Sequence, residues 1–111
     1  MLLALDISTS CTGYCIFDED KLIDIGSINL SKHKGLFEKA SLVKSEILRL
    51  GSKYQISNVA VEENLQAFRP GLSSAKTLMT LAQFNGVVRW ICHERLDVPV
   101  VSINVNTARK N

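Results

Sequence analysis

The chain has 111 residues, of which 46% are hydrophobic and 22% are charged, and this composition is typical of one soluble globular domain that buries a core. A formal net charge of +2 permits nucleic-acid binding without indicating it. The sequence contains no apolar run long enough to cross a membrane and does not begin like a signal peptide, so we expect a cytoplasmic protein.

Three cysteines, Cys11, Cys15 and Cys92, are spread along the chain at no spacing typical of zinc ligands. An odd number of cysteines in a protein without a secretion signal does not suggest a disulfide framework. We therefore expect reduced thiols, most of them buried.

Three strands are predicted in the first third of the chain. Residues 2–7 form a short continuous apolar run, typical of a strand buried on both faces. Small hydroxylated residues at 8–12 predict a turn, residues 13–17 resume a strand pattern, and the charged residues 18–20 predict a second turn before a strand over 21–30. Because the connecting turns are short, the three strands are expected to form an antiparallel meander.

Helices alternate with strands in the rest of the chain. Apolar residues at three- and four-residue steps predict an amphipathic helix from residue 36 to near 51 and a second helix from about 73 to about 95. Buried strands are predicted at 59–61 and 98–103. The order is thus β-β-β-α-β-α-β in a single domain over residues 1–111. Because helical crossovers join parallel strands, the first, fourth and fifth strands should be parallel within a mixed five-stranded α/β sheet with flanking helices.

The second predicted helix carries apolar residues around most of its circumference, whereas a helix that covers one sheet face needs only one apolar stripe. We expect the surplus to meet either a partner subunit or another part of the same chain, and both readings stay open. The contact is expected at those of the following residues that point away from the sheet: Met79, Leu81, Phe84 and Val88.

Two carboxylates follow buried strands directly. Asp6 comes after four apolar residues, and Glu62 comes after Val59, Ala60 and Val61. If these strands are parallel neighbours, both carboxylates lie at the carboxyl edge of the sheet, where open α/β sheets usually bind ligands. Such a pair suits Mg²⁺ or Mn²⁺, which prefer oxygen ligands. Taken singly, each acid could instead cap a turn or pair with a lysine. Glu63 is a second choice, since successive strand residues point to opposite faces.

Several segments, taken in order, carry a resemblance to a known family. These are 3–14, with an aspartate, a small residue two positions on and a later glycine; 59–62, ending at Glu62; 73–78, followed by Gln83 and Gly86; 97–100; and 107–110. Together they resemble the amino-terminal part of RuvC-type Holliday-junction resolvases. The resemblance implies a ribonuclease-H-like fold, a metal-dependent endonuclease that hydrolyses phosphodiesters in four-way or other branched DNA, and a homodimer. The surplus apolar surface of the second helix makes that helix the expected dimer contact.

The resemblance also implies features of the site. Asp6 and Glu62 would be catalytic acids and metal ligands. Phe68, Arg69, Lys76, Arg109 and Lys110 would contact DNA, with Phe68 stacking on an unpaired base or, alternatively, packing over the helix. The family carries two further acids on a helix after the fifth strand, which the 111 residues do not contain. We therefore expect this chain alone to be a weak or inactive nuclease that lacks the carboxyl-terminal catalytic helix.

Two other functions remain open. The segment Asp6–Ser10 is also similar to the first hairpin of sugar kinases and actin-like ATPases, where the turn holds a nucleotide phosphate, so the chain could be a nucleotide-binding fragment. That reading leaves Glu62 unexplained. A non-catalytic DNA-binding module that dimerises through the second helix is the other alternative.

Overall fold

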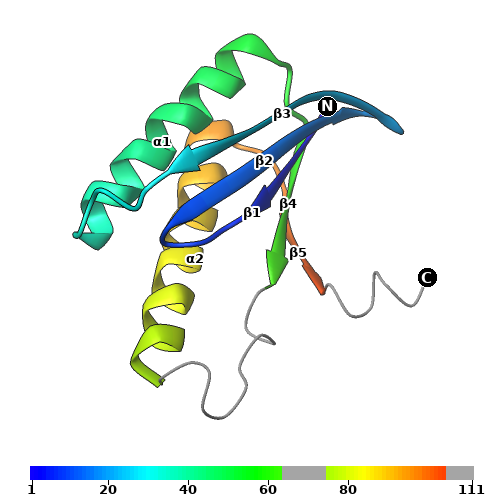
Figure 1. The fold of residues 1–111 in the computed structure, drawn as a ribbon. Helices are drawn as coiled ribbons and strands as arrows, with labels where there is room; N and C mark the ends of the chain where they lie inside the picture. Colours follow the sequence, from blue (N-terminus) through cyan, green and yellow to red (C-terminus); the bar gives the residue numbers. More distant parts are fainter. Residues whose placement is uncertain (64–74, 105–111) are drawn as a thin grey trace.

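The computed structural model of the protein describes residues 1–63 and 75–104. In these residues two helices and the strands of one sheet follow each other along the chain in the predicted order (Figure 1). The elements are β1 (Leu2–Asp6), β2 (Cys11–Asp18), β3 (Lys21–Asn29), α1 (Leu36–Lys53), β4 (Asn58–Glu63), α2 (Ala75–Leu96) and β5 (Val100–Asn104). The predicted α/β class is confirmed, and the boundaries differ from the predicted ones by a few residues. Neither helix combines the length and the hydropathy of a membrane span over the part of the chain that the structure describes.

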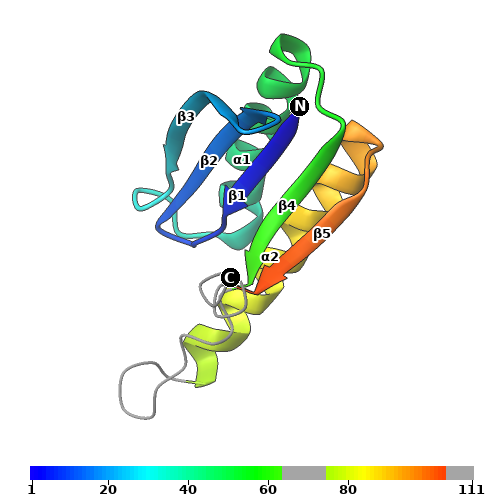
Figure 2. The ribbon, with the colours of Figure 1, turned by 90° about the vertical axis from the view of Figure 1, so that its right-hand side faces the viewer.

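The five strands form one mixed sheet in the order β3-β2-β1-β4-β5. β1 pairs antiparallel with β2, and β2 pairs antiparallel with β3, so the meander is confirmed. β4 lies parallel to β1 on one side and to β5 on the other, as the helical crossovers predict. The carboxyl ends of β1, β4 and β5 therefore meet at one edge of the sheet (Figure 2).

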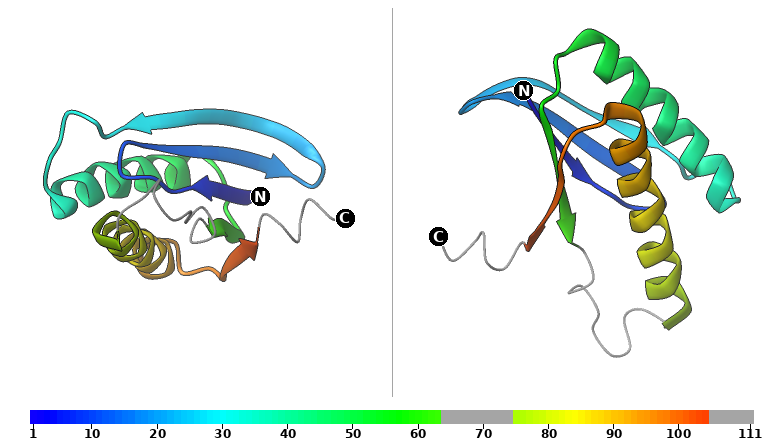
Figure 3. Two further views of the ribbon diagram at one scale, coloured as in Figure 1. Left: turned by 60° about the horizontal axis from the view of Figure 1, so that its bottom comes forward. Right: turned by 180° about the vertical axis from the view of Figure 1, so that it is seen from behind.

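Both helices cover the same face of the sheet (Figures 2 and 3). Alternate residues of β1, Leu3 and Leu5, face them and are buried, as is Ile7 just beyond the strand. Against these pack Ala40, Val43, Ile47 and Leu50 of α1 and Phe84, Val88, Ile91 and Cys92 of α2. The opposite face of β1 is less enclosed, since Ala4 is half-buried and Asp6 is exposed. The prediction that this strand is buried on both faces is wrong for the residues described.

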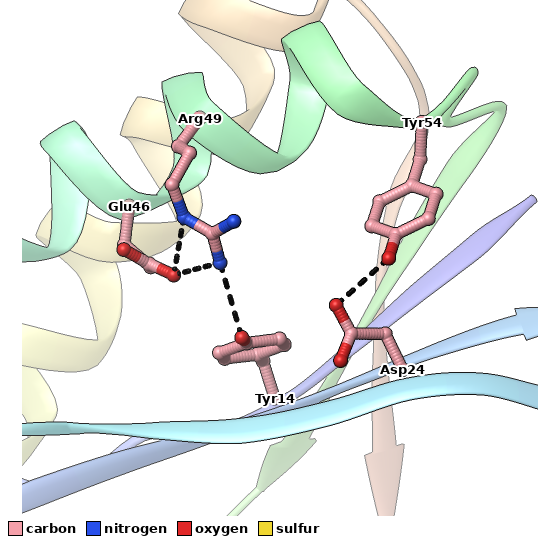
Figure 4. A network of polar contacts seen from close by, with 5 residues as sticks. All are labelled: Tyr14, Asp24, Glu46, Arg49 and Tyr54. Atoms are coloured by element: carbon pink, nitrogen blue, oxygen red, sulfur yellow. Dashed lines mark hydrogen bonds and ion pairs between the residues drawn. The ribbon is translucent and has the colours of Figure 1, made fainter.

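α1 is tied to the sheet by polar contacts as well as by its apolar stripe (Figure 4). Arg49 is bonded to Glu46 within the helix and donates to the hydroxyl of Tyr14 in β2 at 3.1 Å. Tyr54, just beyond the helix, donates to Asp24 of β3 at 2.8 Å. The Tyr14 ring lies against Gly26 of β3, where an added Cβ would come within 2.5 Å of the Tyr14 hydroxyl oxygen. A side chain at position 26 would therefore displace the ring from its contact with Arg49.

The packing of α2 distinguishes its core residues from its exposed apolar residues. Phe84 and Val88 are fully buried and pack into the core with the residues of β1 and α1, so they are not among the residues that point away from the sheet. Leu81 is half-buried, and Met79 remains 63% exposed. Trp90 is 61% exposed and also points away from the core. The surplus apolar surface of α2 is therefore real, but it is carried by Met79 and Trp90.

The cysteines differ in their surroundings more than predicted. Cys11 is exposed, Cys15 is half-buried, and only Cys92 is buried, so the expectation of mostly buried thiols is wrong for the two in β2. All three are free thiols. Burial among apolar side chains of the core raises the pKa of the Cys92 thiol to about 12, because the thiolate is poorly solvated there. Cys92 is thus an inert core residue at neutral pH.

Candidate metal site at the carboxyl edge of the sheet

Asp6 and Glu62 lie side by side at the ends of two parallel strands. The register pairs Leu5 of β1 with Val61 of β4, and one step further along it brings Asp6 beside Glu62. Neighbouring strands are about 4.8 Å apart, so the two side chains leave the backbone within reach of one ion. They project from the sheet face that the helices do not cover, and Glu62 is half-buried while Asp6 is exposed. The structure thus brings together the two acids that the sequence singled out.

A concavity of about 470 Å³ contains both acids. Its floor is made of small residues on the open sheet face, among them Ala4, Gly13 and Ala60. Gly13 is the β2 partner of Asp6, and even an added Cβ there would stay 4.0 Å from the Asp6 Cβ. Ile25 and Ile103 form its apolar walls and remain 66% and 42% exposed. The site is therefore an open hollow on the uncovered sheet face, lined by the two acids, by small residues and by two exposed isoleucines.

The donor set fits a hard divalent cation that keeps part of its own shell. Mg²⁺ usually takes one or two carboxylates from the protein and completes its octahedron with water and substrate phosphate oxygens. Asp6 and Glu62 supply such a pair. No group of three or more His, Cys, Asp or Glu side chains gathers elsewhere in residues 1–63 and 75–104 to offer a competing site of the zinc or calcium kind.

The turn between β1 and β2 follows Asp6 directly and is held by a dense set of hydrogen bonds. The fully buried Thr12 donates its hydroxyl to the Ser8 carbonyl at 3.0 Å and accepts the Ser8 amide at 3.3 Å. The hydroxyls of Ser8 and Ser10 lie 3.1 Å apart on the outside of the turn. From α1, the ammonium group of Lys39 donates to the Thr9 carbonyl at 2.7 Å.

Sequence reasoning missed Lys39, although a signal for it exists. Lys39 follows Leu36 by three residues and precedes Val43 by four, so it lies on the stripe of α1 that turns toward the sheet. A charged residue on that stripe needs a polar partner, and the Thr9 carbonyl is that partner.

Of the five predicted DNA-binding residues, the structure describes only Lys76. Lys76 is exposed in the first turn of α2, at the end of the molecule toward which β4 runs (Figure 1). That turn contains no acidic residue that would offset its charge. Phe68, Arg69, Arg109 and Lys110 lie outside the described residues, and their roles stay predictions.

Comparison with known proteins finds similar proteins both by sequence and by structure. No protein-family model matches the chain. The crossover junction endodeoxyribonuclease RuvC of Fusobacterium nucleatum is 31% identical over 91 residues, which are 78% of this chain and 45% of that protein. The chain therefore spans a little under half the length of this curated relative.

Solved structures share the fold. RuvC of T. thermophilus in complex with a Holliday junction substrate superposes with a TM-score of 0.79 at 16% identity, over 98% of this chain and 67% of that one. A second T. thermophilus RuvC structure gives 0.66 at 18% identity, over 93% of this chain and 63% of that one. The yeast mitochondrial Holliday junction resolvase Ydc2 gives 0.64 at 16% identity, over 98% and 52%. The likeness extends over both helices and the sheet, and it confirms the predicted ribonuclease-H-like arrangement.

Proposed function

We propose that this chain, which is of the RuvC type in sequence and in fold, serves as the metal-binding part of an endonuclease. The proposed substrate is four-way or other branched DNA. The observation that carries the proposal is the pairing of Asp6 with Glu62 at the carboxyl edge of β1 and β4. A nucleotide-binding domain of the kinase type would leave Glu62 without a role.

The proposed cofactor is Mg²⁺ or Mn²⁺, with Asp6 and Glu62 as its protein ligands. When bound, the ion would supply an activated water and stabilise the charge that develops on the leaving oxygen during phosphodiester hydrolysis. Gly13 and Ala60 leave the floor of the hollow low enough for a phosphate to approach the two carboxylates. Ile25 and Ile103 flank it with apolar surface that limits the access of other polar groups.

The proposed partner is branched DNA, the kind of molecule that T. thermophilus RuvC binds in its complex with a Holliday junction substrate. Lys76 would contact a phosphate from the exposed first turn of α2, and such a contact adds affinity without sequence preference. Phe68, Arg69, Arg109 and Lys110 are proposed to complete the DNA surface on the strength of the family resemblance.

The experiment that tests this function is a binding comparison. The protein is titrated into a labelled four-way junction, a linear duplex of the same sequence, and ATP. We expect tighter binding to the junction than to the duplex and no binding of ATP. Equal affinity for junction and duplex would remove the proposed substrate class, and ATP binding in place of junction binding would establish the kinase-like alternative.

We also propose that the protein dimerises through α2. Met79, Gln83, Gly86 and Trp90 follow one another at steps of four, three and four residues, so they form one stripe on the helix, and all four are exposed. Gly86 leaves open space in the middle of the stripe, since even an added Cβ there would meet nothing within 4 Å. A groove of about 520 Å³ runs from Gln83, Gly86 and Trp90 to Phe37 of α1, which is 76% exposed. A second copy, related by a twofold axis, could lay the same stripe against this one.

Replacing Trp90 by Glu is expected to raise the dimer dissociation constant at least about thirtyfold, since a buried aromatic anchor contributes about 2 kcal/mol or more to an interface. Analytical ultracentrifugation over a concentration series measures it. Arg89→Glu is the matched control, because it changes an adjacent exposed residue of α2 that lies off the stripe. A wild-type protein that sediments as a monomer at high micromolar concentration would contradict the dimer.

A further inference from the structure

Lys39 of α1 contacts the turn that follows Asp6. Its ammonium group, part-buried, donates to the Thr9 carbonyl at 2.7 Å across thirty residues of sequence. Most lysines extend into solvent, so a lysine directed at a main-chain carbonyl inside the fold gives up rotamer freedom and hydration for that contact. The contact therefore has a structural or functional consequence at the turn.

Three successive carbonyl groups of the turn accept hydrogen bonds from other parts of the protein. The Ser8 carbonyl accepts from Thr12 at 3.0 Å, the Thr9 carbonyl from Lys39 at 2.7 Å, and the Ser10 carbonyl from the Leu30 amide at 2.9 Å. The hydroxyls of Ser8 and Ser10 lie on the exposed side. The Ser8 and Ser10 hydroxyls bond to each other, and the Ser8 hydroxyl also accepts the Ser10 amide at 3.3 Å, which leaves one hydroxyl proton of the pair to donate outward to an anionic phosphate.

Lys39 holds the middle of these three contacts, at the tip of the turn. Thr12 is fully buried and Leu30 is fully buried, so the two flanking contacts are anchored in the core. Without Lys39, the ends of the turn would stay in place while the Thr9 peptide could rotate. A rotated peptide would expose its carbonyl oxygen, and that oxygen would repel a phosphate bound near the turn.

We propose that Lys39 is a positioning residue of the DNA site. By holding the Thr9 carbonyl inward, it keeps the hydroxyl-bearing side of the β1–β2 turn directed at a DNA phosphate next to Asp6 and Glu62. Lys39 acts through the turn and does not itself contact DNA. This role rests on the proposed function, because it assumes that a phosphate lies beside the two acids.

The test compares Lys39→Met, which keeps the aliphatic stem and removes the ammonium group, with Lys39→Arg, which keeps a charged donor. Lys76→Met serves as the matched control, since Lys76 is the lysine proposed to contact phosphate directly. Each variant and the wild type are titrated with the four-way junction at several salt concentrations. Amide hydrogen exchange at residues 8–11 and thermal unfolding are measured on the same samples.

For Lys39→Met we expect about tenfold weaker junction binding, an unchanged salt dependence, faster exchange in the turn and a nearly unchanged melting temperature. Lys39→Arg should restore binding to within about threefold of wild type. Lys76→Met should instead reduce the slope of log affinity against log salt by about one unit.

Several outcomes would overturn the role of Lys39. The same loss of slope in Lys39→Met would make it a direct phosphate contact. Unchanged junction affinity in that variant, or equal losses in the Met and Arg variants, would leave no positioning effect. A wild type that does not prefer the junction would overturn the proposed function itself, and the wild-type titration shows this separately from any variant.

Discussion

Replacing Asp6 by Asn is expected to weaken Mn²⁺ binding at least tenfold, to the limit of detection by titration calorimetry. Asn keeps the size of the side chain and one oxygen but loses the negative charge that offsets dehydration of the ion. Mutating a residue that only orients a metal ligand typically costs about tenfold or more in metal affinity. Loss of a ligand itself should cost more than this lower bound. Wild-type binding is itself expected to be weak, because the described site offers two carboxylates.

Two further variants control this result. Glu62→Gln should cause a similar loss, since its carboxylate lines the same hollow. Asp24→Asn should bind Mn²⁺ like the wild type, because the Asp24 carboxylate accepts a hydrogen bond from Tyr54 on the side of the sheet that faces α1. Undiminished binding by Asp6→Asn would place the ion elsewhere.

Replacing Phe84 by Ala is expected to lower the free energy of unfolding by about 3–5 kcal/mol. Phe84 is fully buried in the single core cluster that joins α2 to α1 and the sheet, and it is among the largest side chains there. Its removal costs both the transfer of an aromatic ring and the cavity that remains. Urea unfolding followed by circular dichroism measures the change.

Phe37→Ala is the matched control for the same chemical deletion at the surface. Phe37 is 76% exposed, so the change in the free energy of unfolding should stay within about 0.5 kcal/mol at concentrations where the protein is monomeric. A loss below about 1 kcal/mol in Phe84→Ala would mean that α2 does not pack on the sheet through this residue.

The order of elements and the pairing of the two acids could be predicted because they depend on local patterns and one topological rule. The apolar runs before Asp6 and Glu62 mark strand ends, and the intervening helix makes the two strands parallel. Parallel neighbours end at the same edge, so the carboxylates had to meet there if the strands were adjacent.

The environments of single side chains could not be predicted as well. α2 is apolar on several sides, so the sequence alone does not distinguish Phe84, which enters the core, from Trp90, which remains exposed; the packing of α2 beside α1 decides this. Similarly, β2 looks like a strand of a buried sheet, yet one of its faces is not covered by the helices. Cys11 is exposed and Cys15 half-buried for that reason.

Long-range polar contacts could not be predicted from the sequence either. Lys39 and Thr9 are far apart in the chain, and only the placement of α1 across the sheet brings them to 2.7 Å. The same holds for Arg49 and Tyr14. Helical periodicity shows which face of α1 turns inward, but not which main-chain group of the sheet it meets.

The central claim, that one divalent ion binds between Asp6 and Glu62, is tested most directly by NMR with substoichiometric Mn²⁺. Paramagnetic broadening falls off steeply with distance from the ion. We predict that the amide signals of Asp6, Gly13 and Glu62 broaden first. Broadening centred instead on the acidic turn at residues 18–20, which lies at the other end of β2, would contradict the site and the function built on it.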